Sequence, residues 1–289
     1  MSSGHHSITL AAPAKINLSL RILGKRPDGF HELETLMAPI MLADEIEIAH
    51  GRGKEITLTC NDPGIPTGSE NLCVKAAVAF LEEVGLDDGV AISLLKRIPH
   101  GAGLGGGSSD AAAVLKGLND LFDRPLVNEE LHRIGSRLGS DIPFFLADGP
   151  SWCRGRGEIL EPASELPRRH LLLVKPPFPI PTVWAYGKYS ELKQSEKLSE
   201  PLEKQSLGSH EIINDLEIPV FKKYILLPLL KQWLREQSGV ESAFMTGSGS
   251  AMVAVMEQGF SLDCLQEIKK KISEQFGNTL WVVSTEMGS

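Results

Sequence analysis

The sequence predicts an α+β fold with mostly antiparallel sheets, divided into an N-terminal domain over residues 1–160 and a C-terminal domain over residues 161–289. The length of 289 residues is sufficient for two medium-sized domains. Strand-like and helix-like patterns do not alternate strictly along the chain, which disfavours a parallel doubly wound sheet. Residues 149–169 are rich in Gly, Pro and Arg, which is typical of a connection between two halves.

The first half combines strand and helix patterns. Apolar residues alternate over residues 14–23, which predicts a half-buried strand. The same alternation over 45–48 and 55–59 predicts two strands that pair around a turn at residues 51–53. The later elements of this half are predicted as a helix over 71–84 ended by Gly85, a strand over 90–95, a helix from Ser108, a helix from Asn128 to near Gly139, and a helix that starts at residues 140–143.

The second half is predicted to begin with a short buried strand over residues 170–174. The polar composition of residues 190–210 predicts a mobile surface segment. The last elements are predicted as strands over 243–245 and 251–255 around a tight loop at 247–250, an amphipathic helix marked by Leu262, Leu265, Ile268 and Ile272, and a final strand over 280–283.

Composition excludes several classes of function. The formal net charge of −8 argues against general nucleic-acid binding, which needs basic patches. The cysteines, at positions 60, 73, 153 and 264, show no C-x-x-C spacing, so neither a disulfide framework nor a zinc site is expected and a cytoplasmic location fits. The apolar run from Tyr224 to Leu230 is too short to span a bilayer and contains Pro228, so no membrane association is expected.

The segment from Pro99 to Asp110 carries the clearest functional signal. It is rich in glycine, follows a predicted strand and ends in Ser108-Ser109-Asp110, which we expect to cap a helix. A bare backbone that leads into a helix N-terminus presents N–H groups and the positive end of a dipole, an arrangement that suits a phosphate. The sequence therefore predicts a phosphate-binding loop.

Residues 101–106 also satisfy the dinucleotide-binding pattern G-x-G-x-x-G, so a dinucleotide-binding protein stays open as an alternative. About ninety residues precede this loop, however, and no second parallel strand ending in an acid follows the helix. A P-loop is excluded because no Lys follows the glycines, and a protein-kinase loop is excluded because no H-R-D segment is present.

Other residues have side chains suited to catalysis or recognition. Lys15 and Asn17 are expected on the same face of one strand, since side chains repeat every two residues. Phe30 and His31 follow a Pro-Asp-Gly turn and could hold a base by stacking and hydrogen bonding. Asp141 is either the N-cap of a short helix or, beside a lysine, a base that accepts a hydroxyl proton. The loop at 246–250 is either a tight hairpin or a second segment that approaches phosphates or closes over the first loop.

Taken together, PAKINL, RPDGFHEL, the glycine-rich loop, GSDIPFF and MTGSGSA occur in the order and roughly the spacing of one family. From about Ala12 to the final strand, the chain resembles the 4-diphosphocytidyl-2-C-methyl-D-erythritol kinases of the GHMP kinase superfamily. The resemblance implies a two-domain fold, with an N-terminal domain like ribosomal protein S5 and a ferredoxin-like C-terminal domain. It also implies ATP-dependent phosphorylation of the C2 hydroxyl of a cytidyl diphosphate sugar alcohol, a step of non-mevalonate isoprenoid biosynthesis. Another small-molecule kinase of the superfamily is the nearest alternative.

The resemblance assigns roles to residues of this chain. It implies that Asp141 is the catalytic base and that Lys15 orients it. The residues implied to bind ATP are Asn71, Lys96, Pro99, His100, Gly101, Ala102, Gly103, Leu104, Gly105, Gly106, Gly107, Ser108, Ser109 and Asp110, with Ser108 and Ser109 near the phosphates or Mg²⁺. The residues implied to bind the acceptor are Asn17, Phe30, His31, Thr182, Tyr186, Gly247 and Ser248, with the base between Phe30 and Tyr186.

The implied cofactors are ATP and Mg²⁺, and the implied partner is the small-molecule substrate alone. No Glu can be assigned as a metal ligand from the motifs, so the Mg²⁺ ligands stay unknown. Phe30 stands where relatives commonly have Tyr, a change that keeps stacking and removes a phenol hydrogen bond. The protein is expected to be a monomer or a homodimer.

Overall fold

The computed structural model describes residues 7–195 and 205–288. The elements of the first half are β1 (Ser7–Lys25), β2 (His31–His50), β3 (Ile56–Cys60), α1 (Leu72–Val84), β4 (Val90–Leu95), α2 (Gly106–Leu121), α3 (Asn128–Leu138), α4 (Ile142–Leu146), β5 (Ser151–Gly155) and β6 (Ile159–Pro162). Those of the second half are β7 (Arg169–Lys175), α5 (Thr182–Gln194), β8 (Gln205–Leu207), β9 (His210–Asn214), α6 (Glu217–Lys223), α7 (Leu226–Arg235), β10 (Val240–Met245), β11 (Met252–Met256), α8 (Leu262–Phe276) and β12 (Trp281–Met287).

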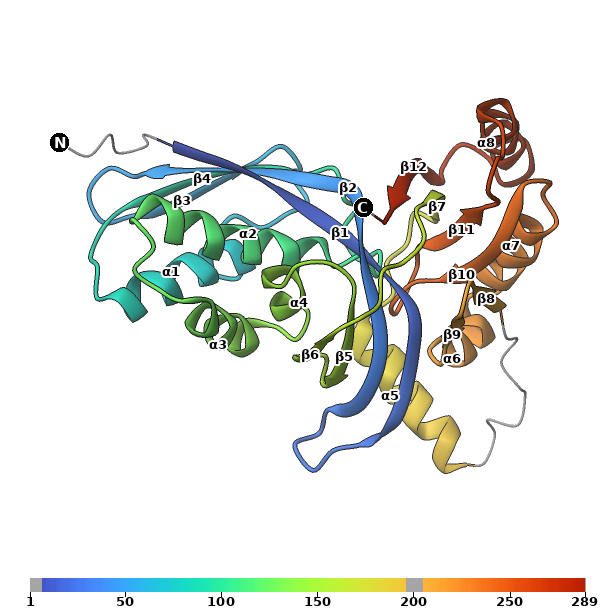
Figure 1. Cartoon of the computed structure of the whole chain (residues 1–289), viewed down its shortest axis with the longest axis horizontal. Helices are drawn as coiled ribbons and strands as arrows, with labels where there is room; N and C mark the ends of the chain where they lie inside the picture. Colours follow the sequence, from blue (N-terminus) through green and yellow to red (C-terminus); the bar gives the residue numbers. More distant parts are fainter. Residues whose placement is uncertain (1–6, 196–204, 289) are drawn as a thin grey trace.

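A long antiparallel hairpin of β1 and β2 runs across the molecule (Figure 1). Along β2, residues 45–50 pair with β4, residues 33–37 pair with β5, and Ile40 pairs with the end of β12. The main strand order is β10-β11-β7-β12-β2-β1-β9-β8. Helices α1 to α4 lie along the β1–β4 part of the sheet, and α5 to α8 lie in the other half of the molecule. The hairpin therefore connects the two halves through backbone pairing.

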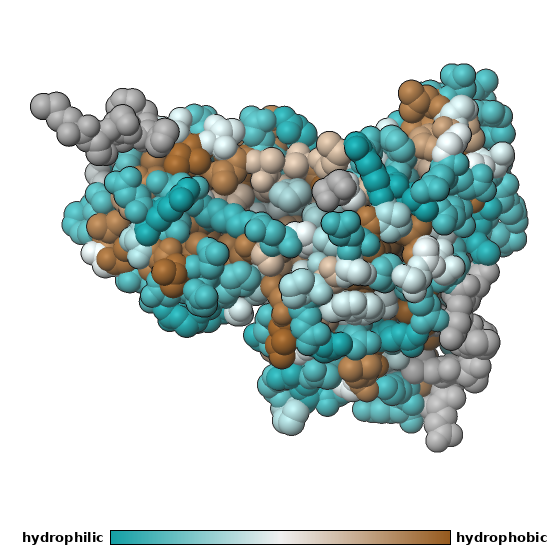
Figure 2. Space-filling model, viewed as in Figure 1, coloured by the Kyte–Doolittle hydropathy of each residue, from teal (hydrophilic) through white to brown (hydrophobic). Residues whose placement is uncertain are grey.

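Buried side chains form three clusters. One lies between the β1–β4 part of the sheet and helices α1 to α4, and it includes the fully buried Phe80 and Leu115. A second fills the other half, around Leu227 and Ile272. The third includes Ile16 of β1 and Phe244 of β10, and it packs the two halves together. Polar residues cover most of the face drawn in Figure 2, with apolar ones scattered between them. Among the described helices, none has both the length and the apolar character needed to cross a bilayer.

Many predicted elements are confirmed, namely the strand over 90–95, the helices over 71–84 and 128–139, the helix after Asp141, the strand–loop–strand over 243–255, the helix after Ser261 and the strands over 14–23, 170–174 and 280–283. The predicted α+β class, with mainly antiparallel pairing, is also confirmed.

The predicted pairing of 45–48 with 55–59 is wrong. β4 lies between β2 and β3, antiparallel to β2 and parallel to β3. The backbone explains this arrangement, because Gly51 N–H donates to Gly89 O at 2.8 Å and Gly89 N–H donates to Gly53 O at 2.9 Å. The turn residues are thus tied to the start of β4. An alternating pattern identifies a strand but does not identify its neighbour.

The predicted start of the helix after the glycine loop is also wrong. Helix α2 begins at Gly106, and its N-cap is Gly105 with a φ of 73° and no capping side chain. Ser109 and Asp110 are buried within the first turns and do not cap the helix. The left-handed φ at Gly105 lets the chain enter the helix two residues earlier than the Ser-Ser-Asp signal suggested.

Two segments, one predicted as a connection between the halves and the other as a mobile surface segment, contain regular structure. Residues 149–169 include the hairpin of β5 and β6, and β5 pairs with β2. The segment 190–210, predicted as mobile, includes the end of α5, strand β8 and the turn into β9, while residues 196–204 lie outside the described residues. Helices α6 and α7 were not predicted. The apolar run that contains Pro228 begins α7, whose first turn tolerates proline.

Candidate active site

A cleft of about 1020 Å³ lies between the β1–β2 hairpin, the glycine-rich loop, the start of α4, helix α5 and the loop after β10. All the candidate site residues predicted from the sequence line this cleft except Ser109. Ser109, in the first turn of α2, is 1% exposed and does not line the cleft. The fold therefore brings together segments that are separated by more than 200 residues in the sequence.

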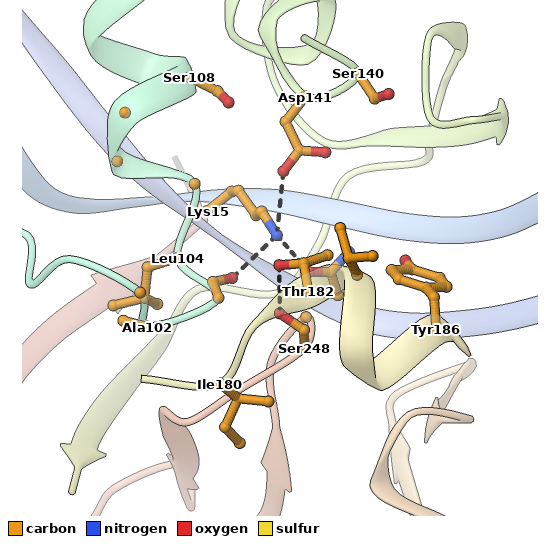
Figure 3. Close-up of a pocket in the computed structure, with 18 of the residues that line it drawn as sticks. Lys15, Ala102, Leu104, Ser108, Ser140, Asp141, Ile180, Thr182, Tyr186 and Ser248 are labelled. Atoms are coloured by element: carbon orange, nitrogen blue, oxygen red, sulfur yellow. Dashed lines mark hydrogen bonds and ion pairs between the residues drawn. The ribbon is translucent and has the colours of Figure 1, made fainter. Parts of the chain in front are cut away.

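Lys15 lies at the centre of the cleft on β1, although only 4% of the residue is exposed. Its ammonium donates to Asn17 Oδ1 at 2.6 Å and to Gly103 O at 3.0 Å. The same nitrogen lies 3.6 Å from Asp141 Oδ2 (Figure 3). The prediction that Lys15 and Asn17 share a strand face is confirmed. One cation thus joins β1, the glycine loop and the start of α4.

Asp141 occupies the N-cap position of α4 but makes no capping hydrogen bond with its side chain. The predicted N-cap position is therefore confirmed, but capping by the Asp141 side chain is not. The carboxylate instead points toward Lys15, and 32% of the side chain is exposed at the cleft. Pro143 lies in the first turn of this short helix, where no backbone N–H donor is needed. The pair can place an anionic proton acceptor and a cation against one substrate group.

The glycines of the first loop serve different purposes. A Cβ on Gly103 would lie 2.3 Å from Thr246 O, so this glycine allows two loops to touch. A Cβ on Gly106 would lie 3.0 Å from Ile98 Cγ2 and 3.1 Å from Lys96 Nζ. At Gly107 the nearest neighbouring atom, on Leu72, is 3.9 Å away. Gly107 therefore leaves space at the cleft side of α2, beside the free N–H groups of its first turn.

The second small-residue loop packs against the first, as the sequence analysis considered possible. Ala251 N–H donates to Ala102 O at 3.1 Å, and a Cβ on Gly247 would meet Gly103 O at 2.9 Å. The Ser248 and Thr182 hydroxyls are 3.0 Å apart and face the cleft near Tyr186 (Figure 3). Two hydroxyls from different elements thus converge on one wall.

The hairpin end of the cleft is aromatic. The His31 and Tyr186 rings stack with centroids 5.2 Å apart, and His31 Nε2 lies 2.6 Å from Ser190 Oγ. Burial, assisted by the charge of Lys25, lowers the pKa of His31, so the ring is neutral at neutral pH. Burial also raises the pKa of the Tyr186 phenol, which keeps it protonated. Phe30 is 50% exposed at the hairpin tip.

Arg156 was missed by the sequence analysis. It follows β5, lines the cleft and places its guanidinium 5.0 Å from the centroid of the Phe30 ring. The only local sign that Arg156 has a function is that it lies between Gly155 and Gly157. These residues belong to the segment that the sequence predicted as a connection between the two halves. The structure adds this cation to the aromatic end of the cleft.

Two residues expected near adenosine have their polar groups occupied. Asn71 caps α1 by accepting from Cys73 N–H at 2.8 Å, and its amide donates to Pro66 O. The Lys96 ammonium is paired with Asp44 and Asp110 and is 7% exposed as a side chain. Asp44 was also missed by the sequence analysis. Burial, countered in part by Lys96, raises the pKa of Asp110 to about 7.

Within residues 7–195 and 205–288, no three His, Cys, Asp or Glu side chains are grouped in a way that could hold a metal ion. Ser109 Oγ and Asp110 Oδ1, both near the start of α2, are buried without a hydrogen-bond partner. At the cleft itself, the Ser108 hydroxyl at the start of α2 and the Asp141 carboxylate at the start of α4 are two of the oxygen groups that line the cavity (Figure 3).

Known proteins are similar to this chain in both sequence and fold. Residues 71–149, which span α1 to α4, match the model of the GHMP kinases N terminal domain. A 4-diphosphocytidyl-2-C-methyl-D-erythritol kinase of Methylacidiphilum infernorum is 49% identical over 261 residues, which cover 89% of each chain. The enzyme of the same name from Chlorobium phaeobacteroides is 40% identical over 87% of this chain and 90% of its own.

Solved structures agree with these relatives. The crystal structure of a 4-(cytidine 5'-diphospho)-2C-methyl-D-erythritol kinase superimposes with a TM-score of 0.75 and 32% identity, covering 98% of this chain and 100% of the other. Mevalonate kinase from L. major, in complex with R-mevalonate, has a TM-score of 0.71 at 18% identity, covering 100% of this chain and 99% of its own. The second likeness is one of fold alone.

Proposed function

The chain belongs to the 4-diphosphocytidyl-2-C-methyl-D-erythritol kinases of the GHMP superfamily, and we propose that it phosphorylates the C2 hydroxyl of 4-(cytidine 5'-diphospho)-2-C-methyl-D-erythritol with ATP. The products are ADP and the 2-phosphate, in the non-mevalonate route to isoprenoids. The observation that supports the chemistry best is the Lys15–Asp141 pair, which faces the cleft beside the N-terminus of α2. The opposite end of the cleft supplies the aromatic groups that a cytosine needs.

ATP is proposed to lie along the glycine-rich loop, with its phosphates at the first turn of α2. The first N–H groups of a helix have no partner within the helix, and together with the dipole they attract an anion. The open space at Gly107 admits phosphate oxygens to these groups. The Ser108 hydroxyl is a further donor at the same place. Ser109, which is buried, is withdrawn from the set of proposed phosphate contacts.

The cytidyl diphosphate is proposed to lie across the other end of the cleft. A neutral His31 ring offers both a donor and an acceptor, which suits the mixed edge of cytosine. Phe30 and Tyr186 supply ring faces for stacking, although in this structure Tyr186 stacks on His31. The hydroxyls of Thr182 and Ser248, 3.0 Å apart, are proposed to bind the diphosphate. This end of the cleft supports acceptor binding separately from ATP binding.

Catalysis is proposed to use Asp141 as the general base. The carboxylate accepts the proton of the C2 hydroxyl while that oxygen attacks the γ-phosphorus of ATP. The Lys15 ammonium, 3.6 Å from the carboxylate, orients it and offsets negative charge on the transferring group. A positioned general base contributes about 10²–10⁴ in rate, and the alignment of the two substrates supplies much of the rest.

Mg²⁺ is proposed to enter with ATP. This ion keeps several waters and binds proteins through one or two oxygen groups plus the substrate phosphates. The Ser108 hydroxyl and the Asp141 carboxylate at the cleft fit such a limited contribution from the protein. When bound, the ion would neutralise phosphate charge.

Two further properties are part of the proposal. The described cysteines are all free thiols, which supports a reducing, cytoplasmic location. The cleft is built from one chain, so either a monomer or a homodimer could hold a complete site.

The proposed reaction is tested by ADP release with Mg²⁺-ATP and the cytidyl substrate, with mevalonate, homoserine and galactose as control alcohols. Turnover with the cytidyl substrate alone supports the proposal. ATP-dependent turnover with one of the other alcohols would assign a different acceptor. If the protein binds a nicotinamide dinucleotide and releases no ADP, the dinucleotide alternative replaces the kinase.

Replacing Gly107 with leucine should weaken ATP binding at least about tenfold while the protein stays folded. Helix position 107 has no left-handed φ, and a Cβ there meets only Leu72 at 3.9 Å. Leucine also favours a helix over glycine by about 0.5–1 kcal/mol. The side chain must therefore extend into the space proposed for phosphate. Calorimetric titration with ATP and the melting temperature measure the two effects, and undiminished ATP affinity would place the phosphates elsewhere.

Replacing Tyr186 with alanine should raise the KM for the cytidyl substrate about tenfold, because an aromatic stacking platform contributes about 1–3 kcal/mol per base. Neither kcat nor the KM for ATP should change more than about twofold. Phe30→Ala, at the hairpin tip, should show the same selectivity. Steady-state kinetics with each substrate varied in turn measures this, and equal losses for both substrates would indicate damage to the fold instead.

A further inference from the structure

Asp44 connects β2 to the segment that enters the glycine-rich loop. It is fully buried, with an exposure of 0%. One carboxylate oxygen accepts from the backbone N–H groups of Arg97 and Ile98, the latter at 2.8 Å, and the other accepts from the Lys96 ammonium. Residues 96–98 directly follow β4 and directly precede the loop. A single side chain thus holds three consecutive residues at the loop entrance.

Lys96 extends this connection to the far side of the loop. Its ammonium also donates to Asp110 Oδ2 at 2.8 Å, and Asp110 lies in helix α2. The same nitrogen is 3.1 Å from the position that a Cβ on Gly106 would take. The cluster of Asp44, Lys96 and Asp110 therefore forms the floor of the first turn of α2, the turn proposed to face the ATP phosphates.

The charges of this cluster do not explain its position. Two carboxylates and one ammonium give no positive potential that would attract a phosphate. Buried ion pairs also often stabilise a fold no more than well-packed apolar residues of the same volume, whereas the loss of one partner is strongly destabilising. The contribution specific to this cluster is its hydrogen bonding, which fixes backbone on both sides of the loop.

We propose that Asp44 is a positioning residue for ATP: by holding residues 96–98 and the Lys96 ammonium, it fixes the loop and the first turn of α2 in the shape that binds the phosphates. Asp44 itself touches no substrate. The inference rests on the proposed placement of ATP at this loop.

The test is Asp44→Asn, which keeps the shape of the side chain but has one acceptor oxygen in place of two. It can no longer accept both from the Lys96 ammonium and from the backbone N–H groups of residues 97 and 98. Hydrogen bonds to a charged group contribute about 1.5–3 kcal/mol, so the Kd for ATP should rise about tenfold to a hundredfold. The KM for the acceptor alcohol, and kcat at saturating ATP, should stay within about twofold.

Glu217→Gln is the matched control. Glu217 is also buried, and it accepts from Lys231 at 2.7 Å and from Met245 N–H at 2.9 Å, outside the residues that line the cleft. This variant should lose stability and keep its ATP affinity within about twofold. If both variants lower ATP affinity equally, the effect is general destabilisation and the inference fails.

Two further outcomes separate the inference from the placement of ATP. If Gly107→Leu weakens ATP binding and a folded Asp44→Asn does not, the phosphates lie at the loop but Asp44 does not position it. If neither of these two variants changes ATP affinity, the proposed placement of the ATP phosphates at the loop is wrong.

Hydrogen exchange of the wild-type protein adds a measurement that needs no variant. The amides of Arg97 and Ile98 should exchange slowly without ATP, and rapid exchange would overturn the inference even where Asp44→Asn does not fold.

Discussion

Replacing Asp141 with asparagine should lower kcat by about 10²–10⁴-fold, the range expected for the loss of a general base. An amide of the same size cannot accept the hydroxyl proton. It can still occupy the position 3.6 Å from Lys15, because its side-chain oxygen accepts a hydrogen bond. The fold should survive since the Asp141 side chain makes no capping bond to α4. The melting temperature should therefore change little.

Binding separates this result from a general loss of the site. ATP and the cytidyl substrate should each bind Asp141→Asn with Kd values within a few-fold of wild type, measured by calorimetric titration. Asp148→Asn is the matched control, because Asp148 is an exposed carboxylate just past the other end of α4. It should keep full activity. Near-wild-type turnover by Asp141→Asn would remove this residue as the base and leave Lys15 to act through charge alone.

Elements with a strong local signal could be predicted from the sequence. Helix α1 carries a capping Asn71 and ends at Gly85 in a left-handed conformation, so both ends are marked. In β2, buried and exposed residues alternate clearly near the C-terminal end of the strand. The sequence pattern predicted a strand only for that part, residues 45–48. Residues 35–38 are buried on both faces, because Leu36 and Ala38 pack into one apolar cluster and Met37 packs into another, so the pattern there is not that of a half-buried strand.

The residues of the site likewise divide into those that a local sequence motif predicts and those that it does not. Lys15, Asp141 and the glycine loop lie in motifs that the sequence displays, and the structure brings them into one cleft. Asp44 and Arg156 carry no such signal, because their partners, Ile98 and Phe30, are more than 50 residues away in the sequence. The start of α2 was misplaced for a related reason. Ser109 and Asp110 have typical capping side chains, but the left-handed φ of Gly105 lets the helix begin at Gly106, and a Cβ on Gly105 would collide with Phe145 of α4.

Replacing Lys15 with methionine should lower kcat by at least about 10²-fold, since charge stabilisation by one preorganised group contributes about 10²–10³. Methionine nearly matches the length of the lysine stem but leaves Asn17 Oδ1, Gly103 O and Asp141 Oδ2 without their shared cation. Arginine should not restore activity. The Lys15 side chain packs closely against Gly105, because a Cβ added to that glycine would lie 3.0 Å from Lys15 Cγ and 2.8 Å from Phe145. The larger guanidinium of arginine therefore has no room at this position.

A double-mutant cycle decides whether Lys15 acts through Asp141. If the lysine serves mainly to orient the base and to offset its charge, the variant with both Lys15→Met and Asp141→Asn should be only about as slow as the slower single variant. If the two losses of kcat multiply, the ammonium acts on the transferring phosphoryl group independently of the carboxylate. Single-turnover rates at saturating ATP and acceptor measure the cycle without a contribution from binding or product release. The geometry favours the first result, because one nitrogen contacts the glycine loop, Asn17 and the carboxylate at once.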